Sequence, residues 1–167
     1  MAGGGEFDCV YVVDASAWIF IEGHPAQNRI LYCLTQLIEA GRIICPTESW
    51  DEVKKCPWVI AWLGALRRQI VESPSSVEYL LMVGRVTHAF PSMAGARQRK
   101  ERADQYVVGL AAYLNEASNP KRVHEVVASE SDRRRPNRKI PTACEHFGVA
   151  CHTLLEVLAR EFPDEEW

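Results

Sequence analysis

The sequence predicts a three-layer α/β/α sandwich built around a mostly parallel sheet. Short apolar runs rich in β-branched residues alternate with amphipathic segments of helical period, which is typical of an α/β fold. The chain has 167 residues, of which 47% are hydrophobic and 25% charged, values ordinary for one globular domain. Its apolar stretches are all shorter than the roughly 18 residues that a membrane span needs.

The first predicted strand is 9–13, "CVYVV", a short run of β-branched and aromatic residues. A brief helix follows it and stops near Gly23 and Pro25. The segment 26–40 predicts an amphipathic helix that ends at Gly41, because four apolar residues share one of its faces: Ile30, Leu34, Leu37 and Ile38.

The middle of the chain is predicted to be mostly helical. The run 42–45, "RIIC", is a second strand, and Pro46 with Thr47 opens the helix that follows. Residues 57–90 predict a helical pair broken at 72–76, "ESPSS", and we expect this pair to cover one side of the domain.

The remainder returns to the alternation of helix and strand. We expect a helix over 103–117, a strand over 123–130, a short helix ended by Gly148, a short strand over 149–151 and a closing helix over 152–162. These elements divide the chain into a flexible lead-in, 1–8, a single domain, 9–162, and a tail, 163–167.

The six cysteines favour reduced thiols and a cytoplasmic protein, because the chain starts without the basic and apolar regions of a signal peptide. A zinc site is conceivable at "CEHFGVACH", but the chain offers no second pair at a standard finger spacing.

Acidic residues fall where strands end or helices begin. Asp14 ends the first strand, Glu48 and Glu52 lie one helical turn apart, and Asp104 opens the helix at 103–117. Two more acids, Glu130 and Asp132, follow the third strand. Ligand sites in open parallel sheets lie beyond the carboxyl ends of the strands, so these acids are expected to converge.

Converging carboxylates indicate a divalent cation, because they repel one another unless a cation lies between them. Mg²⁺ or Mn²⁺ prefers such oxygen ligands and acidifies a water that can attack a phosphodiester. Each acid also has a structural interpretation: Asp14 as the N-cap of the next helix, Glu48 as a favourable charge in a first turn, and Asp104 as a helix cap.

Five segments in order resemble the motif series of the PIN-domain superfamily: "YVVDASAWI", "RIICPTESWDEV", "RADQYVVGLAAYL", "VVASES" and "KIPTACEHFGVACHTLLEVL". The nearest branch resembles the VapC-like ribonuclease toxins of bacterial toxin–antitoxin systems. The resemblance spans Cys9 to Phe162 and implies a Mg²⁺- or Mn²⁺-dependent endoribonuclease, a cognate antitoxin as partner and a possible homodimer.

By position, the resemblance makes Asp14, Glu52 and Asp104 the first three acids, with Ser16 as the supporting hydroxyl. The fourth acid of the family falls on Ser131, in the stretch "SES" that begins at Ser129. Either Glu130 or Asp132 then substitutes for it, or the site has three acids.

Two basic clusters flank these acids and predict contacts with RNA phosphates. Since the net charge is −3, binding to a polyanion depends on such local clusters. They comprise Arg97, Arg99, Lys100 and Arg102 before the third acid, and Arg133, Arg134, Arg135, Arg138 and Lys139 after the third strand.

Two other functions are consistent with parts of the pattern. A phosphotransferase that uses Asp14 as nucleophile usually has a second Asp two residues on, where this chain has Ser16. A PIN-like module that has lost its fourth acid could instead bind RNA or a protein without cleaving either.

Overall fold

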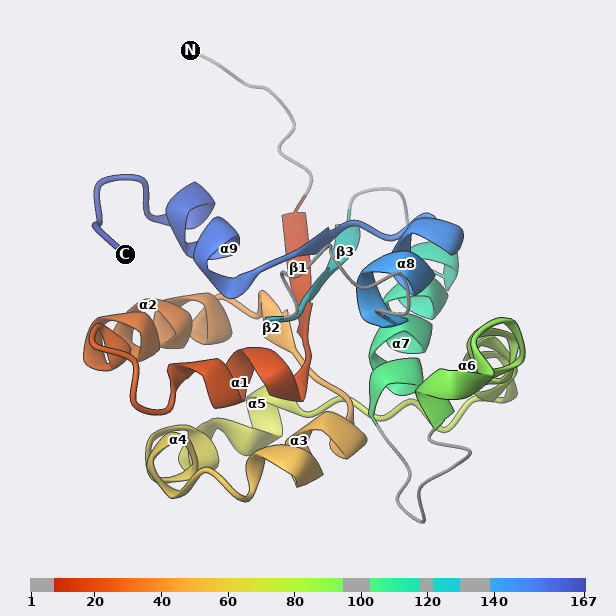
Figure 1. Cartoon of the computed structure of the whole chain (residues 1–167), viewed down its shortest axis with the longest axis horizontal. Helices are drawn as coiled ribbons and strands as arrows, with labels where there is room; N and C mark the ends of the chain where they lie inside the picture. Colours follow the sequence, from red (N-terminus) through yellow and green to blue (C-terminus); the bar gives the residue numbers. More distant parts are fainter. Residues whose placement is uncertain (1–7, 95–102, 118–121, 130–138) are drawn as a thin grey trace.

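The computed structural model describes residues 8–94, 103–117, 122–129 and 139–167. Within these ranges, a four-stranded parallel sheet has the strand order β2-β1-β3-β4 and is covered by helices on both faces (Figure 1), which confirms the predicted α/β/α class. The strands are β1 (Asp8–Val13), β2 (Ile43–Ile44), β3 (Arg122–Val127) and β4 (Cys151–His152).

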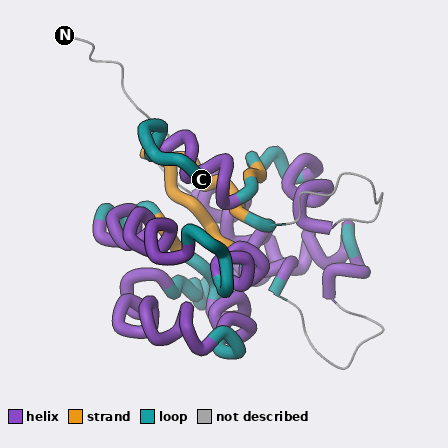
Figure 2. Tube along the Cα trace, turned by 60° about the vertical axis from the view of Figure 1, so that its left-hand side comes forward, coloured by secondary structure: helices purple, strands orange, loops and turns teal. Residues whose placement is uncertain are grey.

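Two helical layers enclose the sheet, and Figure 2 shows the strands between them. One layer contains α1 (Ala15–Ile21), α2 (Gln27–Glu39), α3 (Thr47–Val53), α4 (Pro57–Leu63), the 3-10 turn η1 (Gly64–Leu66), α5 (Arg67–Ile70) and α9 (Leu154–Glu161). The other contains α6 (Val77–Ala89), the 3-10 turn η2 (Pro91–Ala94), α7 (Asp104–Ala117) and α8 (Lys139–His146).

Each face of the sheet has its own core, because successive side chains of a strand point to opposite faces. In β1, Tyr11 and Val13 join the core beneath α1, α2 and α9. Val10 and Val12 join the core beneath α6, α7 and α8. A continuous apolar run such as "CVYVV" is therefore what a central parallel strand requires.

The helical pair expected to cover one side of the domain is instead divided between the two faces. Leu63 of α4 and Ile70 of α5 pack in one core, whereas Met82 of α6 packs in the other. After α5 the chain runs beside the end of β2, where Cys45 forms a bridge with Val71. The extended break "ESPSS" thus carries the chain past the edge strand to the opposite face.

Glycines and a capping box determine where several helices end or begin. Gly41 and Gly148 adopt φ of 68° and 66° just after α2 and α8, the left-handed conformation that favours glycine. Thr153 and Glu156 form a reciprocal capping box at the start of α9.

Residues 163–167 lie against the domain, since the Trp167 ring contacts Phe162. None of the described helices is long and apolar enough to cross a membrane.

Close packing of α7 on α6 leads to a stability prediction for Gly109. A Cβ atom added there would lie 2.8 Å from Val83 Cγ2 and 3.2 Å from Val83 Cα, which is backbone. We expect Gly109→Ala to lower the free energy of unfolding by about 1–3 kcal/mol through overpacking. Urea denaturation measures this, with Gly64→Ala as the control because the space around Gly64 is open. Equal effects of the two substitutions would contradict the prediction.

Candidate functional site

The candidate site lies at the carboxyl edge of the sheet, where β1 and β3 end (Figure 1). Asp14 directly follows β1, and Ser129 comes two residues after β3. Because α7 leads into the parallel strand β3, its first residue, Asp104, also lies at this edge. This is the place where ligands bind in open parallel sheets.

Asp14 is a buried carboxylate that also caps α1. Only 4% of the residue is exposed, its Oδ2 atom accepts a hydrogen bond from the Ser16 N–H at 2.9 Å, and its own N–H donates to the Val127 carbonyl at 2.8 Å. The capping interpretation is therefore confirmed. No ion pair reaches Asp14 from the described residues. Burial raises the pKa of this carboxyl group, and the hydrogen bonds from Ser16 and Ala15 only partly oppose the rise.

The charge of Asp14 acts on thiols from two other elements. Burial and then the Asp14 carboxylate raise the pKa of Cys45, at the end of β2, to about 12. The pKa of Cys144 in α8 is raised by its hydrogen bond with Cys151, by burial, and also by Asp14. Asp14 thus lies centrally, within reach of groups from both faces of the sheet.

Ser16 connects the ends of the two central strands. Its hydroxyl oxygen accepts a hydrogen bond from the Ser129 N–H at 3.1 Å. The same residue donates its backbone N–H to Asp14, so the chain after β3 is held next to the carboxylate. The predicted supporting residues Ser16 and Ser129 are therefore brought together at the site.

Glu52 is held against the start of α7. Its Oε1 atom accepts a hydrogen bond from the Ala103 N–H at 3.1 Å, and Ala103 immediately precedes Asp104. The second predicted acid therefore lies against the start of α7, the helix that Asp104, the third predicted acid, opens. Glu48 affects a residue of α6: the pKa of Tyr79 is raised mainly by burial and then by the negative charge of Glu48.

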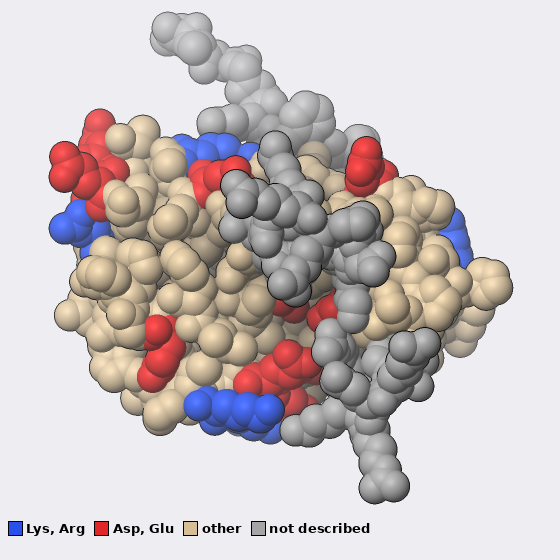
Figure 3. Space-filling view, viewed as in Figure 1, with Lys and Arg blue, Asp and Glu red and all other residues tan. Residues whose placement is uncertain are grey.

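Figure 3 shows acidic side chains low in the centre of the view, in the region of α3 and next to basic side chains. Two buried polar residues in the same helices were missed by the sequence analysis. Ser49 is fully buried and Gln105 is 3% exposed, and neither Ser49 Oγ nor Gln105 Oε1 has a hydrogen-bond partner among the described residues. The only signal in the sequence is a polar residue beside each acid, within an otherwise apolar helix face.

The described ranges contain no group of three His, Cys, Asp or Glu side chains close enough to hold a metal, so the structure does not bring Asp14, Glu52 and Asp104 together as one ligand set. Mg²⁺ keeps several waters and commonly uses one or two carboxylates, the rest of its shell coming from the substrate. Asp14, as a buried carboxylate with no ion pair among the described residues, could hold such a partly hydrated ion.

Several predicted site residues lie outside the described residues. They are the fourth-acid candidates Glu130 and Asp132 and most of the basic clusters: Arg97, Arg99, Lys100, Arg102, Arg133, Arg134, Arg135 and Arg138. The backbone of Lys139 begins α8, but its side chain is not described. Trp18 is wholly buried in the core.

A small cavity opens beside the site. It has a volume of about 160 Å³ and is lined by Phe20, Ser129, Thr153, Leu154 and Leu155. Phe20 is 36% exposed, and its ring centroid lies 5.0 Å from that of His24. None of the described lining residues carries a charge, so the cavity suits a flat, neutral group.

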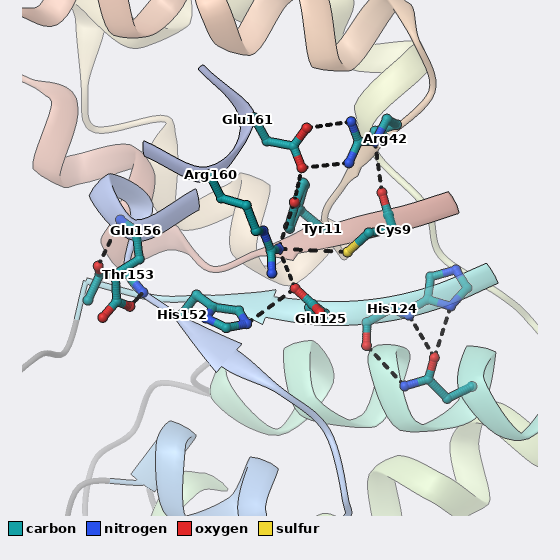
Figure 4. Close-up of polar contacts among 11 residues, drawn as sticks. Cys9, Tyr11, Arg42, His124, Glu125, His152, Thr153, Glu156, Arg160 and Glu161 are labelled. Carbon is teal, nitrogen blue, oxygen red and sulfur yellow. Dashed lines mark hydrogen bonds and ion pairs between the residues drawn. The ribbon is translucent and has the colours of Figure 1, made fainter. Parts of the chain in front are cut away.

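A second polar cluster, shown in Figure 4, lies where α9 covers β1 and β3, and the sequence analysis did not anticipate it. Glu161 accepts hydrogen bonds from both terminal nitrogens of Arg42 at 2.6 Å and from the Tyr11 hydroxyl. Arg160 donates to Tyr11 Oη at 2.7 Å and to Glu125 at 2.5 Å. The two guanidinium groups also lie 5.6 and 5.2 Å from the centroid of the Tyr11 ring.

This cluster is structural, because its members join elements that are distant in the sequence. Arg42 precedes β2, Tyr11 is in β1, Glu125 is in β3, and Arg160 and Glu161 end α9. The side chain of Glu161 is 15% exposed and that of Arg42 is 23% exposed, so their contact is partly shielded from water. The cluster anchors the last helix to the central strands β1 and β3 and to the start of the edge strand β2.

Comparison with families of known sequence gave one match, to a domain of unknown function designated DUF4411, over residues 11–162. Neither the comparison with curated proteins nor that with solved structures gave a match. The matched range begins in the middle of β1 and ends just after α9, so it includes the other three strands, the end of β1 and the candidate site. The chain therefore belongs to the DUF4411 family.

Proposed function

We propose that this protein is a Mg²⁺- or Mn²⁺-dependent endoribonuclease of the PIN type, acting in the cytoplasm as the toxin of a toxin–antitoxin pair. The observation that supports this proposal most is Asp14, a carboxylate that is buried at the carboxyl edge of a parallel sheet and has no ion pair within the described part of the chain. The contact between Glu52 and the start of α7 adds two further acids at the same edge. The order of sequence motifs that resembles the PIN superfamily points to the same chemistry.

A bound cation accounts for the placement of Asp14 better than capping alone. An N-cap needs only a short polar side chain, and Ser, Thr or Asn would serve without a charge. A buried carboxylate is disfavoured relative to its protonated form unless a cation or hydrogen bonds compensate it. A divalent ion supplies that compensation, and we take this as the reason for an acid at this position.

In this proposal, the residues of the site have different roles in RNA hydrolysis. When bound, Mg²⁺ or Mn²⁺ acidifies a water and stabilises negative charge on the phosphate. Asp14 would hold the ion, and the Ser16 N–H, which donates to its Oδ2 atom, fixes the orientation of the carboxylate. Ser16 and Ser129 hold the end of β3 against α1, which keeps the two sides of the site at a constant distance. The basic clusters would attract the RNA backbone.

The uncharged cavity beside Ser129 offers a place for one base of the RNA. Phe20 is exposed enough to stack on a base, and aromatic side chains are the usual stacking partners of unpaired RNA bases. Since the cavity holds about 160 Å³, it suits a single flat ring system better than a larger ligand.

The decisive experiment is cleavage of a panel of structured and single-stranded RNAs by the purified protein. We expect cleavage with Mg²⁺ or Mn²⁺, and loss of cleavage with EDTA or in Asp14→Asn, which keeps the helix cap. A contaminating metal-dependent nuclease would also be inhibited by EDTA. The Asp14→Asn protein is therefore the essential control. An absence of cleavage together with an absence of Mn²⁺ binding by calorimetry would refute the nuclease proposal.

A more local prediction concerns Glu52. In Glu52→Gln the amide oxygen can still accept the Ala103 N–H, so we expect the melting temperature to change little. Loss of the charge should weaken Mn²⁺ binding by about tenfold or more, as loss of a ligand or of its support commonly does. Calorimetric titration measures this, with Glu48→Gln as the matched control one helical turn earlier. If Glu48→Gln lost more Mn²⁺ affinity than Glu52→Gln, Glu48 rather than Glu52 would be the residue that supports the metal.

One observation favours a second candidate, a PIN-like module that binds RNA or an antitoxin without cleaving. The described residues provide no three-ligand metal group, and Ser131 stands where the resemblance predicts the fourth acid. Metal binding separates the two candidates, because a binding module has no need of Mn²⁺. RNA binding that is unchanged by EDTA, without cleavage, would favour the module.

A further inference from the structure

Two of the six cysteines are brought together by the turn that follows α8. Cys144 lies in the last turn of α8 and is fully buried, whereas Cys151 begins β4 and is partly exposed. Both residues pack in the core beneath α6, α7 and α8. Neither belongs to a disulfide, and the proposed RNA hydrolysis uses neither thiol.

The turn has the hydrogen bonds of a Schellman motif, which reverses the chain at the end of a helix. The Val149 N–H donates to the Cys144 carbonyl at 2.8 Å, and the Gly148 N–H donates to the Glu145 carbonyl at 3.2 Å. Gly148 supplies the left-handed φ of 66° that this motif requires. Val149 is therefore folded back onto Cys144, and Cys151, two residues further on, packs in the same core.

The sheet holds Cys151 from its other side. Cys151 pairs with Val126 of β3. Backbone hydrogen bonds flank this pair, since the carbonyls of Ala150 and His152 accept from β3 and from the residue after it at 2.8 and 3.0 Å. The thiols of Cys144 and Cys151 consequently lie in hydrogen-bond contact. From such contact, only a small movement brings two sulfur atoms within the roughly 2 Å of a disulfide bond.

We propose that Cys144 and Cys151 form an oxidisable dithiol, which a hydroperoxide converts into a disulfide between α8 and β4. Cys151 reacts first, because it is the thiol of the pair that solvent reaches. The hydrogen bond with Cys151 and then burial raise the pKa of the Cys144 thiol, so Cys144 keeps its proton and donates it to the sulfur of Cys151. A donor at this position stabilises a thiolate at Cys151, which is the nucleophilic form.

The oxidation takes place in two steps. The Cys151 thiolate attacks one peroxide oxygen, the O–O bond breaks and the leaving oxygen takes up a proton, which produces a sulfenic acid at Cys151 and an alcohol or water. The sulfur of Cys144 then attacks that of Cys151. The S–S bond forms as the S–O bond breaks, and the departing hydroxide takes the proton of Cys144 and becomes water. Two electrons pass from the thiols to the peroxide, and two equivalents of a small thiol reverse the reaction.

Cys9 is a matched control within the same chain. It is partly exposed, as Cys151 is, but the groups that act on its thiol are Glu125, Tyr11 and Arg160, and none of these is a thiol. Burial and then the Glu125 carboxylate raise the pKa of Cys9 to about 11, so little thiolate is present near neutral pH. We therefore expect peroxide to spare Cys9.

Treatment of the reduced, full-length protein with a small excess of hydrogen peroxide tests the proposal, independently of RNA cleavage. We expect the intact mass to fall by two hydrogen atoms. The number of thiols that can be alkylated in denaturant should fall from six to four, since the bridge uses two. Peptide mapping without reduction should find Cys144 joined to Cys151, and dithiothreitol should restore all six thiols. An unchanged mass, or a bridge between any other pair, would overturn the proposal.

Variants separate the roles of the two thiols. In Cys144→Ala the sulfenic acid lacks its partner, so the protein should gain one oxygen atom at Cys151, which dimedone traps, and lose no hydrogen. Cys151→Ala should neither gain oxygen nor form a bridge. Cys33→Ala is the matched control, because Cys33 is equally buried but lies in the other core, and it should behave as wild type. Circular dichroism verifies that each variant is folded. Oxidation of Cys9 before Cys151, or of Cys144 in Cys151→Ala, would contradict the assignment.

Discussion

Replacing Asp14 by asparagine is expected to stabilise the metal-free protein and to abolish its response to Mn²⁺. The amide oxygen can accept the Ser16 N–H as the carboxylate does, so the cap of α1 is retained. The substitution removes a charge that is 4% exposed and has no ion pair within the described chain. We expect a gain of about 1–2 kcal/mol near pH 7, or roughly 2–8 °C in the melting temperature of a chain of this length.

The pH dependence follows from the raised pKa of Asp14. Its ordinary value is 3.8, and below that pH the group is protonated in both the folded and the unfolded chain. The stability that the protonated group contributes is lost as the pH rises through the raised pKa of the folded state. The difference between Asp14→Asn and wild type should therefore be smallest in acid and largest at neutral pH.

Mn²⁺ should reverse the order of stability at neutral pH. Under the proposed function, Mn²⁺ would bind the Asp14 carboxylate of the folded wild-type protein and stabilise that protein by mass action, whereas Asp14→Asn lacks the charge to bind it. Thermal melts with and without Mn²⁺ measure both effects. The control is Asp51→Asn, which removes an exposed acid that lies 2.6 Å from Lys54. A destabilised Asp14→Asn, or one that Mn²⁺ stabilises as strongly as wild type, would contradict this account.

Replacing Glu161 by glutamine is expected to lower the free energy of unfolding by about 2–4 kcal/mol, because it breaks a partly buried ionic network. Glu161 accepts from two nitrogens of Arg42 and from the Tyr11 hydroxyl, whereas a glutamine amide has one acceptor oxygen and no charge. The guanidinium of Arg42 would remain half enclosed without its counter-charge. Urea denaturation at pH 7 measures the loss.

The pH dependence of this network has the opposite sign to that of Asp14. Burial alone would raise the pKa of Glu161, but the hydrogen bonds from Arg42 and Tyr11 outweigh burial and lower it. The network's contribution is thus present above the ordinary value of 4.5 and is lost as the pH falls through the lowered pKa. The penalty of Glu161→Gln should shrink in acid. Glu165→Gln, at an exposed ion pair with Arg29, should cost less than about 1 kcal/mol.

The sequence predicted what depends on local pattern. The strand at 9–13, the helix at 26–40 and the helix at 103–117 lie within two residues of their observed bounds, because the spacing of apolar residues determines them and, for the helix at 26–40, Gly41 ends it. The position of Asp14 at a strand end, and its burial, also follow from an apolar run that stops at an acid. The fourth acid and the basic clusters stay predictions, since they lie outside the described residues.

Features that depend on long-range packing were not predictable in this way. Nothing near "ESPSS" indicates that α6 lies on the opposite face from α4, because that depends on how the chain passes the edge of the sheet. Tyr11 reads as a core residue of a strand, and only the folded chain brings Arg42, Arg160 and Glu161 to its ring and hydroxyl. Ser49 and Gln105 look ordinary in sequence and become notable only once they are buried.

The pairing of β1 with β3 has a consequence for the order of events during synthesis. Residues 8–13 pair with residues 122–127, so the central ladder cannot form until most of the chain has left the ribosome. Contacts between such distant segments also form slowly in folding. The hydrogen bond from the Ser129 N–H to the Ser16 hydroxyl depends on that pairing. So does the hydrogen bond from the Asp14 N–H to the Val127 carbonyl. A nascent chain that ends before β3 therefore has α1 and its acid but lacks the contacts that assemble the candidate site, and these form only when translation is nearly complete.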